Sequence, residues 1–382
     1  MAADQIRLLV IEDVPQVASH IRALLAGQSL IKIVDVLESG ERAVAAVSQL
    51  KPNVVIVDAL LRGDMTGRQV AELIRDHEPQ VAVVMLTVPQ NPIVEDPQRG
   101  IDAVLSMPFS GFDLTAMVRK THETRTVESA RAGSYTVSLF SPKGGVGRTT
   151  MAFNLAVALA ARHRVCLVDG SLQFSDLRGL LRVPPIAPSI LNLPTDRITE
   201  SDLQEVAWRD PSGIDILLAP PRIEMAEMIT VRDLEKVLSI LRQIYEFVVI
   251  DTRSGLQDDV LAFLDSSDLI MLLVTSDGVA IRSLSMAIGA FEAIGYPAEK
   301  LTTVLNRNDP ARTITTVEVE QALGRPIEFS ISSDYPVVGA ANNEGLPFVT
   351  SSPDAAISAD VRRMADALSA RLQQRSPAMA RR

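Results

Sequence analysis

Short apolar runs alternate with longer segments of helical periodicity along most of the chain. The runs at 8–11, 54–57, 83–86, 165–168 and 247–250 are rich in Val, Ile and Leu and have the length of buried strands. Strands that alternate with helices are typical of α/β proteins, in which the crossover helices make the strands parallel. The pattern therefore predicts an α/β fold built on mostly parallel sheets.

A weakly patterned segment divides the chain into two predicted domains. With 382 residues the chain is long enough for two cores. Residues 124–134 are small and polar, as in a linker, and separate a first domain at 1–123 from a second at 135–375. Residues 376–382 are predicted to form a flexible basic tail. Prolines crowd 182–194, which predicts an irregular loop inside the second domain.

The most informative motif begins after the apolar run that ends at Phe140. A loop with three glycines leads into an Ala/Leu-rich segment, 150–161, that is predicted to be a helix. Glycines allow backbone N–H groups to converge on a phosphate at a helix N-terminus, while two cations and a hydroxyl suit phosphate and Mg²⁺. The sequence indicates a nucleotide-binding loop formed by Lys143, Gly144, Gly145, Val146, Gly147, Arg148, Thr149 and Thr150.

This loop departs from the common pattern G-x-x-x-x-G-K-[ST], because Pro142 replaces the first glycine and Arg148 the lysine before the hydroxyl. It resembles the deviant Walker A motif of the MinD/ParA ATPases, K-G-G-x-G-K-[ST]. The resemblance implies a P-loop ATPase domain that binds ATP and Mg²⁺ and forms a homodimer. Lys143 matches the signature lysine, which in that family reaches the partner's nucleotide. Arginine at 148 keeps the charge of the phosphate lysine but changes its shape.

Further motifs of the second domain follow the same family. Asp169 stands at the first switch, where the family often has a second aspartate that helps to position the attacking water. Here that second position is Ser171, whose hydroxyl can orient water but cannot act as a carboxylate base. The predicted catalytic residues are Lys143, Asp169 and Ser171, and hydrolysis is expected to be slow or to depend on a partner.

Two later strands supply the remaining nucleotide contacts that the resemblance implies. The run 247–250 ends on Asp251 as in a Walker B strand, so Asp251 and Thr149 are the predicted Mg²⁺ ligands. The segment 303–307 is similar to the family's base-recognition strand. Asn306 is therefore expected to hydrogen-bond the adenine, with Arg307 beside it.

Acidic residues also follow the strands of the first domain. Glu12 and Asp13 come after one strand, Asp58 ends another and Thr87 ends a third. Because the carboxyl ends of parallel strands share one edge of a sheet, these side chains could converge there. Convergent carboxylates bind Mg²⁺ and would leave Asp58 poised to accept a phosphoryl group.

This set resembles the receiver domain of two-component response regulators, over about 6–123. The resemblance implies a flavodoxin-like fold with Asp58 as phospho-acceptor, Glu12 and Asp13 as Mg²⁺ acids and Thr87 as the switch hydroxyl. Receivers carry a Lys-Pro after the fifth strand, whereas this chain has Met107. Three prolines within 89–97 also disfavour the helix that usually carries the output signal. An atypical receiver of this kind acts as a phospho-switch or as a docking domain.

Composition narrows the function classes. The net charge of −10 argues against non-specific nucleic-acid binding, and the single cysteine, Cys166, excludes a disulfide or a cysteine-ligated metal site within one chain. No secretory signal and no apolar run of membrane-spanning length are visible, so a cytoplasmic location without a membrane span is expected. The amphipathic segment 357–372 either closes the second domain or lies on a membrane surface.

A receiver-like domain followed by a MinD/ParA-like ATPase resembles the CpaE/TadZ family of type IVb (Flp/Tad) pilus assembly proteins. The segments 172–176 and 217–227 are similar to that family. The resemblance implies a dimerising localisation or assembly factor whose partners are pilus and secretion proteins at the cell envelope, which recruit it to the inner membrane or cell pole. The alternatives are a pseudo-ATPase scaffold and a partition ATPase that acts on DNA.

Overall fold

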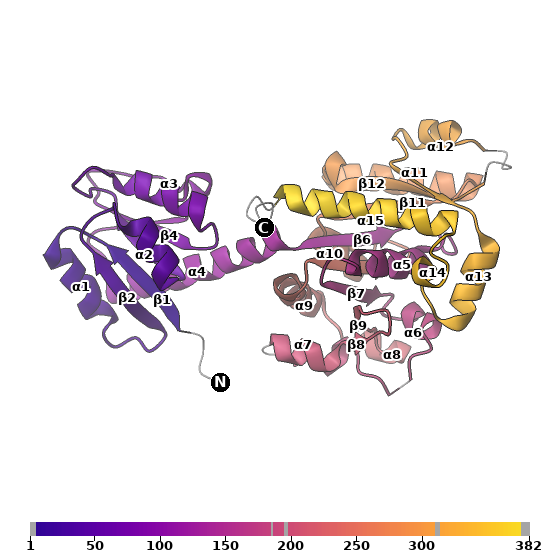
Figure 1. Cartoon of the computed structure of the whole chain (residues 1–382), viewed down its shortest axis with the longest axis horizontal. Coiled ribbons are helices and arrows are strands. Elements are labelled where there is room, and N and C mark those ends of the chain that lie inside the picture. Colours follow the sequence, from indigo (N-terminus) through magenta and orange to yellow (C-terminus); the bar gives the residue numbers. More distant parts are fainter. Residues whose placement is uncertain (1–4, 185, 195–197, 310–313, 376–382) are drawn as a thin grey trace. The chain divides into compact units, whose positions relative to one another are not determined.

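The computed structural model describes residues 5–184, 186–194, 198–309 and 314–375. The chain divides into two compact units, the first ending at Ala130 and the second beginning at Arg131 (Figure 1). Each unit has its own β-sheet with helices on both faces. The predicted α/β class with mostly parallel sheets is confirmed.

The first unit is built on a five-stranded parallel sheet. Its strands are β1 (Ile6–Ile11), β2 (Ile31–Leu37), β3 (Val54–Asp58), β4 (Ala82–Thr87) and β5 (Ala103–Ser106). Their order in the sheet is β2-β1-β3-β4-β5, and every neighbouring pair is parallel. The predicted strands at 8–11, 54–57 and 83–86 correspond to β1, β3 and β4, because each apolar run is buried on both faces of this sheet.

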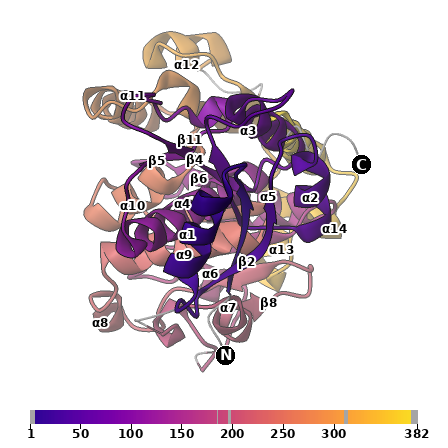
Figure 2. The same ribbon diagram turned by 90° about the vertical axis from the view of Figure 1, so that its left-hand side faces the viewer.

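Four helices cover the two faces of this sheet (Figure 1, Figure 2). They are α1 (Pro15–Leu25), α2 (Ala43–Leu50), α3 (Gly67–His77) and α4 (Gly111–Gly133). Buried residues of α1 and α4 share one core with the sheet, and those of α2 and α3 share the other. Among the described residues between β4 and β5 the only helix is a 3₁₀ turn at Pro97–Arg99, so the expected loss of an α-helix around 89–97 is confirmed.

The segment 124–134 was expected to be a weakly patterned linker, yet helix α4 continues through it to Gly133. The reason is local, since 124–132 contain neither proline nor glycine and include Ala, Arg and Glu, which favour helices. Gly133 ends the helix, and Ser134 alone separates it from the first strand of the second unit. The connection between the units is therefore helical for most of its length.

The second unit is built on an eight-stranded sheet. Its strands are β6 (Tyr135–Phe140), β7 (Val165–Gly170), β8 (Trp208–Arg209), β9 (Asp215–Leu217), β10 (Phe247–Thr252), β11 (Leu269–Val274), β12 (Leu301–Asn308) and β13 (Phe329–Ser332). The order is β13-β12-β11-β6-β10-β7-β9-β8, and only the β8–β9 pair at the edge is antiparallel. Strand β6, which leads into the glycine-rich loop, lies in the middle of this sheet.

Helices again cover both faces. They are α5 (Arg148–Ala160), α6 (Asp176–Leu180), α7 (Glu200–Val206), α8 (Ile223–Ala226), α9 (Val231–Ile244), α10 (Asp258–Ser266), α11 (Gly278–Ala293), α12 (Thr316–Leu323), α13 (Tyr335–Glu344), α14 (Phe348–Ser351) and α15 (Ala356–Arg375), with 3₁₀ turns at Ile190–Asn192 and Ala298–Lys300. Helices α5 and α15 pack on one face, and α9, α10 and α11 on the other. In the proline-rich stretch 182–194, the described residues form only the first of these 3₁₀ turns, as the prolines predict.

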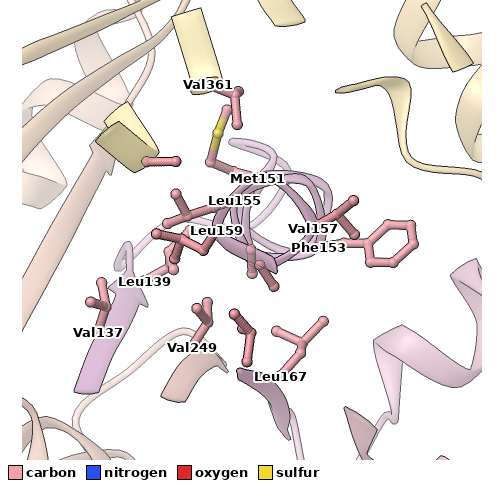
Figure 3. Close-up of a cluster of buried hydrophobic side chains, with 14 of the residues drawn as sticks. Val137, Leu139, Met151, Phe153, Leu155, Val157, Leu159, Leu167, Val249 and Val361 are labelled. Carbon is pink, nitrogen blue, oxygen red and sulfur yellow. The ribbon is translucent and has the colours of Figure 1, made fainter. Parts of the chain in front are cut away.

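Helix α5 is the centre of the larger core (Figure 3). Figure 3 looks along this helix and shows Leu155 and Leu159 above Leu139 of β6, while Met151 meets Val361 of α15. Because α5 begins at the glycine-rich loop, its burial on both sides fixes the position of that loop against the sheet.

Helix α15 settles the alternatives for 357–372. Its apolar stripe belongs to the core that α5 centres, with Val361, Met364 and Leu368 fully buried. The stripe is therefore used to close the second unit. In the described part of the chain, no helix is long and apolar enough to cross a bilayer. Residues 376–382, expected to form a flexible tail, lie outside the described residues.

Replacing Leu368 by Ala should lower the free energy of unfolding of the second unit by about 2–5 kcal/mol, because it leaves a cavity between α15 and α5. Thermal or urea unfolding would measure the change. Gln373→Ala, at an exposed position of the same helix, is the control and should change stability by less than about 0.5 kcal/mol. Unchanged unfolding of Leu368→Ala, together with a loss of vesicle binding, would contradict the assignment of this helix to the core.

Candidate functional site

The glycine-rich loop joins β6 to α5 at the carboxyl edge of the second sheet. Gly147 precedes the helix with φ 92°, a conformation that side chains rarely adopt. A Cβ atom there would also lie 2.7 Å from Nδ2 of Asn306. The loop can therefore expose its N–H groups at the start of α5, where the helix dipole favours an anion. This geometry suits the predicted phosphate contacts.

Arg148 is the first residue of α5 and is largely turned inward. Its Nη1 donates hydrogen bonds to the carbonyl of Ser141 at 2.7 Å and to the hydroxyl of Ser254 at 3.1 Å. Burial lowers the pKa of Arg148, and the nearby carboxylates of Asp251 and Asp176 oppose that shift. An arginine stays protonated even so. The guanidinium thus bridges the start of the loop and the segment after β10.

Lys143 has a different partner. Its Nζ lies 3.8 Å from Oδ1 of Asp277, and both side chains are more than a third exposed. Asp277 also caps α11, since it accepts hydrogen bonds from the N–H of Ala280 and the hydroxyl of Thr275. Burial raises the pKa of Asp277, but these bonds and Lys143 lower it on balance. Lys143 is held within its own chain by a pair that is open to solvent.

Asp169 and Asp251 are adjacent on β7 and β10, at the same edge as the loop. Both are buried, and among the described residues neither Oδ2 of Asp169 nor either oxygen of Asp251 has a hydrogen-bond partner. Burial raises the pKa of Asp251 to about 7, and the nearby Thr149 hydroxyl and Arg148 oppose the shift. Burial and the charge of Asp251 raise the pKa of Asp169.

Buried carboxylates without partners are costly unless a cation compensates them. Oxygen ligands from Asp251 and Thr149, beside a phosphate loop, are the donors that Mg²⁺ prefers. The residues therefore fit a magnesium nucleotide. Ser171 lies next to this pair and is buried, and its N–H donates to Oδ1 of Asp169 at 3.2 Å. Its side chain adds no carboxylate at the position expected for the water-orienting acid.

Asn306 and Arg307 lie at the end of β12, beside a cavity that is partly open to solvent. The Nδ2 group of Asn306 donates to the carbonyl of Val146 at 2.7 Å, so the residue also supports the loop. The guanidinium of Arg307 lies over the ring of Tyr335. The cavity is lined by Gly147, Thr150, Met151, Asn306, Arg307, Ser332, Ser333, Asp334, Tyr335, Val338, Asn342, Phe348 and Ile357.

Several of these contacts were not predicted from the sequence. Ser254 and Asp277 bind the two loop cations, and Tyr335 and Asn342 line the cavity. Only Asp277 left a local signal, because Asp before Gly278 at the start of a helical segment is typical of an N-cap. The others come from distant segments that only the folded sheet brings to the loop.

A second group of acids occupies the carboxyl edge of the first sheet. Carboxylate oxygens of Glu12, Asp13 and Asp58 lie within 4.8 Å of one another. Among the described residues, Oε2 of Glu12 and Oδ1 of Asp13 are buried without a hydrogen-bond partner. Burial raises the pKa of Glu12 to about 7 and also raises that of Asp58. The sequence prediction that these acids converge is confirmed, and the donor set fits Mg²⁺.

Neighbouring backbone groups lie close to Asp58. The N–H of Leu60 donates to its Oδ1 at 3.1 Å, and a Cβ on Gly67 would lie 2.1 Å from its carbonyl oxygen. Thr87 ends the neighbouring strand, and its hydroxyl donates to the carbonyl of Asn91 at 2.6 Å. Met107 packs against the core where a receiver has its lysine. The site thus has the acids and the hydroxyl of a receiver without that ammonium.

Comparison with known families divides the chain in the same way. Residues 8–119 match the family described as response regulator receiver domain, and 134–300 match the family described as AAA domain. The response regulator protein VraR of Staphylococcus saprophyticus is 31% identical over 127 residues, which are 33% of this chain and 60% of that protein.

The second unit is similar to proteins of known fold and function. The septum site-determining protein MinD of Thermotoga maritima is 25% identical over 215 residues, covering 54% of this chain and 78% of that protein. A ParA family ATPase of Chlorobium tepidum shares the fold with a TM-score of 0.57 and 23% identity, over 61% of this chain and 98% of its own. MinD of Pyrococcus horikoshii, solved with Mg-ADP, has a TM-score of 0.53 and 23% identity, over 64% and 99%. The chain is therefore an α/β protein with an N-terminal response regulator receiver domain followed by a MinD/ParA-like P-loop ATPase domain.

Proposed function

We propose that this protein is an ATP-binding, dimerising localisation or assembly factor of a type IVb (Flp/Tad) pilus secretion system, with slow or partner-stimulated ATP hydrolysis. The observation that carries ATP binding is the pair of buried acids next to the glycine-rich loop, Asp169 and Asp251. Among the described residues, Oδ2 of Asp169 and both carboxylate oxygens of Asp251 have no hydrogen-bond partner. Asp251 and Thr149 would hold Mg²⁺ beside a bound nucleotide, and its charge would compensate the two acids. The Mg-ADP bound to the Pyrococcus horikoshii relative supports the same cofactor here.

Dimerisation is proposed from the position of Lys143. It is 37% exposed, at the mouth of the loop, and its Asp277 partner is also solvent-accessible. Exposed ion pairs contribute at most about 1 kcal/mol, so this lysine can leave Asp277 at little cost. In the proposed dimer Lys143 contacts the phosphates of the nucleotide bound by the partner subunit.

The pilus role is supported by the two segments that resemble CpaE/TadZ, because they pack on each other. The hydroxyl of Ser175 donates to the carbonyl of Pro220. Just after the first segment, Nε of Arg178 donates to the carbonyl of Ala219 at 2.9 Å. Large apolar side chains in and near these segments, Phe174 and Met228, are exposed. We propose that proteins of the pilus machinery bind this surface and thereby recruit the factor to the cell envelope.

A pseudo-ATPase scaffold is the second candidate, and two observations favour it. Arg148 is already satisfied by Ser141 and Ser254, and Ser171 leaves the hydrolytic site without its second acid. Such a protein would bind nucleotide without turnover and recruit partners in the bound state. The two candidate functions differ only in whether bound ATP is hydrolysed, so measuring the rate of ATP hydrolysis separates them.

Lys143→Ala should abolish ATP-dependent self-association while nucleotide binding is reduced less, because only the contact across the dimer is lost. Sedimentation or light scattering with Mg-ATP would measure the association. Asp277→Asn is the matched control, since Asn caps a helix as well as Asp but carries no charge to hold the lysine. Dimerisation should persist in the control. A Lys143→Ala protein that associates as wild type does would refute the proposed role of this lysine.

Ser171→Asp should raise Mg²⁺-dependent ATP turnover about tenfold or more, because it restores a carboxylate that can orient the attacking water. Phosphate release under saturating ATP would measure it. Asp251→Asn added to this variant should remove the gain, since it removes a proposed metal ligand. The absence of turnover in both wild type and Ser171→Asp, with ATP still bound, would instead favour the scaffold.

For the first unit we propose that Glu12, Asp13 and Asp58 bind Mg²⁺ and that Asp58 accepts a phosphoryl group. With the pKa of Glu12 near 7, protons compete with the metal below that value. Mg²⁺ affinity should be about tenfold weaker at pH 6 than at pH 8. Calorimetric titration of the nucleotide-free Asp251→Asn protein would measure it, since that substitution weakens the other metal site.

The control for the pH dependence is Glu12→Gln in the same background. It should bind Mg²⁺ more weakly, with most of the pH dependence between 6 and 8 removed. An affinity of the parent protein that does not change between these pH values would contradict the contribution of Glu12.

A further inference from the structure

The acid cluster of the first unit lacks a cation at its usual place. Met107 follows β5 and packs against the apolar core. A phosphoryl group on Asp58 together with Glu12 and Asp13 would carry a charge of about −4, of which Mg²⁺ removes two. About two negative charges would remain within a few ångströms of one another. Stable phosphorylation therefore requires a positive group from another element.

Arg62 lies in the loop between β3 and α3 and meets this requirement. Its N–H donates to Oδ2 of Asp13 at 3.1 Å, and its Nε lies 3.8 Å from the same oxygen. The carboxylate of Asp13 is in turn within 4.8 Å of that of Asp58. The backbone of Arg62 is thus fixed at the edge of the cluster.

The side chain of Arg62 is free to change partner. It is 86% exposed, whereas the Asp13 side chain is only 12% exposed. At 3.8 Å, Nε of Arg62 and Oδ2 of Asp13 form an ion pair but are too far apart for a hydrogen bond. An exposed pair of this kind is weak, so a stronger anion nearby can attract the guanidinium away. Arginine also offers a planar fork that matches phosphate oxygens.

We propose that Arg62 replaces the missing lysine as the ionic partner of the phosphoryl group on Asp58. This inference rests on the proposed phospho-acceptor role of Asp58. In the step, a carboxylate oxygen of Asp58 forms a bond to the phosphorus of a donor such as acetyl phosphate. The bond from phosphorus to the acetate oxygen breaks, and acetate leaves with the electron pair. Arg62 is a positioning residue that moves from Asp13 to the transferred group.

The proposal predicts effects of opposite sign in two measurements. Before phosphorylation, Arg62 competes with Mg²⁺ for Asp13, so its removal should strengthen Mg²⁺ binding. After phosphorylation it neutralises the new charge, so its removal should weaken the phosphorylated state. If Arg62 had only a structural role, its removal would weaken both Mg²⁺ binding and the phosphorylated state, because damage to the loop would disturb the metal and the phosphoryl group alike.

The experiment uses the full chain with Asp251→Asn, titrated first with Mg²⁺ and then with beryllium fluoride at saturating Mg²⁺. Beryllium fluoride is an analogue of the acyl phosphate. Arg62→Ala should bind Mg²⁺ about twofold more tightly and beryllium fluoride about fivefold more weakly. Arg62→Lys should restore most of the beryllium fluoride affinity. Arg68→Ala, which removes an exposed arginine at the start of α3, is the matched control and should change neither.

The possible results separate the two hypotheses. Opposite shifts in Arg62→Ala, with rescue by lysine, support the proposal. Beryllium fluoride binding that is unchanged, or that weakens together with Mg²⁺ binding, overturns the role of Arg62 and leaves Asp58 as phospho-acceptor. If the parent protein binds Mg²⁺ but no beryllium fluoride and takes no phosphoryl group from labelled acetyl phosphate, the role of Asp58 fails, and the inference fails with it.

Discussion

Buried negative charge that nearby cations compensate only in part is the constraint on which both units depend. In a parallel sheet all strands end at one edge, so acids that follow different strands are brought together. Asp169 and Asp251 meet in this way in the second unit, and Glu12, Asp13 and Asp58 in the first. Burial raises the pKa of four of these acids, because the charged form is disfavoured away from water. They are Glu12 and Asp58 in the first unit and Asp169 and Asp251 in the second. A divalent cation at each edge would remove this cost.

The fold was predictable because its signals are local. Apolar runs of strand length, separated by helical segments, gave the strands β1, β3, β4, β7 and β10 and the parallel class. The convergence of Glu12, Asp13 and Asp58 followed from topology alone, since each of them stands at the end of a strand in the same sheet. Such predictions need only the period of the pattern and the direction of the strands.

Contacts between distant segments were beyond that reasoning. The sequence indicated that Arg148 is a phosphate residue, but its bond to Ser254 joins positions 106 residues apart. The hydrophobic pattern also does not predict the helix over 124–133, because its periodicity there is low, although the residue propensities and the lack of breakers in 124–132 favour a helix. The stripe of α15 left two interpretations open, and only packing against α5 decided between them.

The pair formed by Lys143 and Asp277 has a kinetic consequence. An exposed pair worth at most about 1 kcal/mol changes the population of the free lysine by no more than about fivefold. Rearrangement of an exposed side chain takes nanoseconds or less, far faster than the diffusional meeting of two proteins. In the proposed dimer, release of this lysine would therefore not limit how fast two nucleotide-bound subunits associate. The rate of association would then depend on the concentration of subunits, so local accumulation of the protein would itself set when assembly begins.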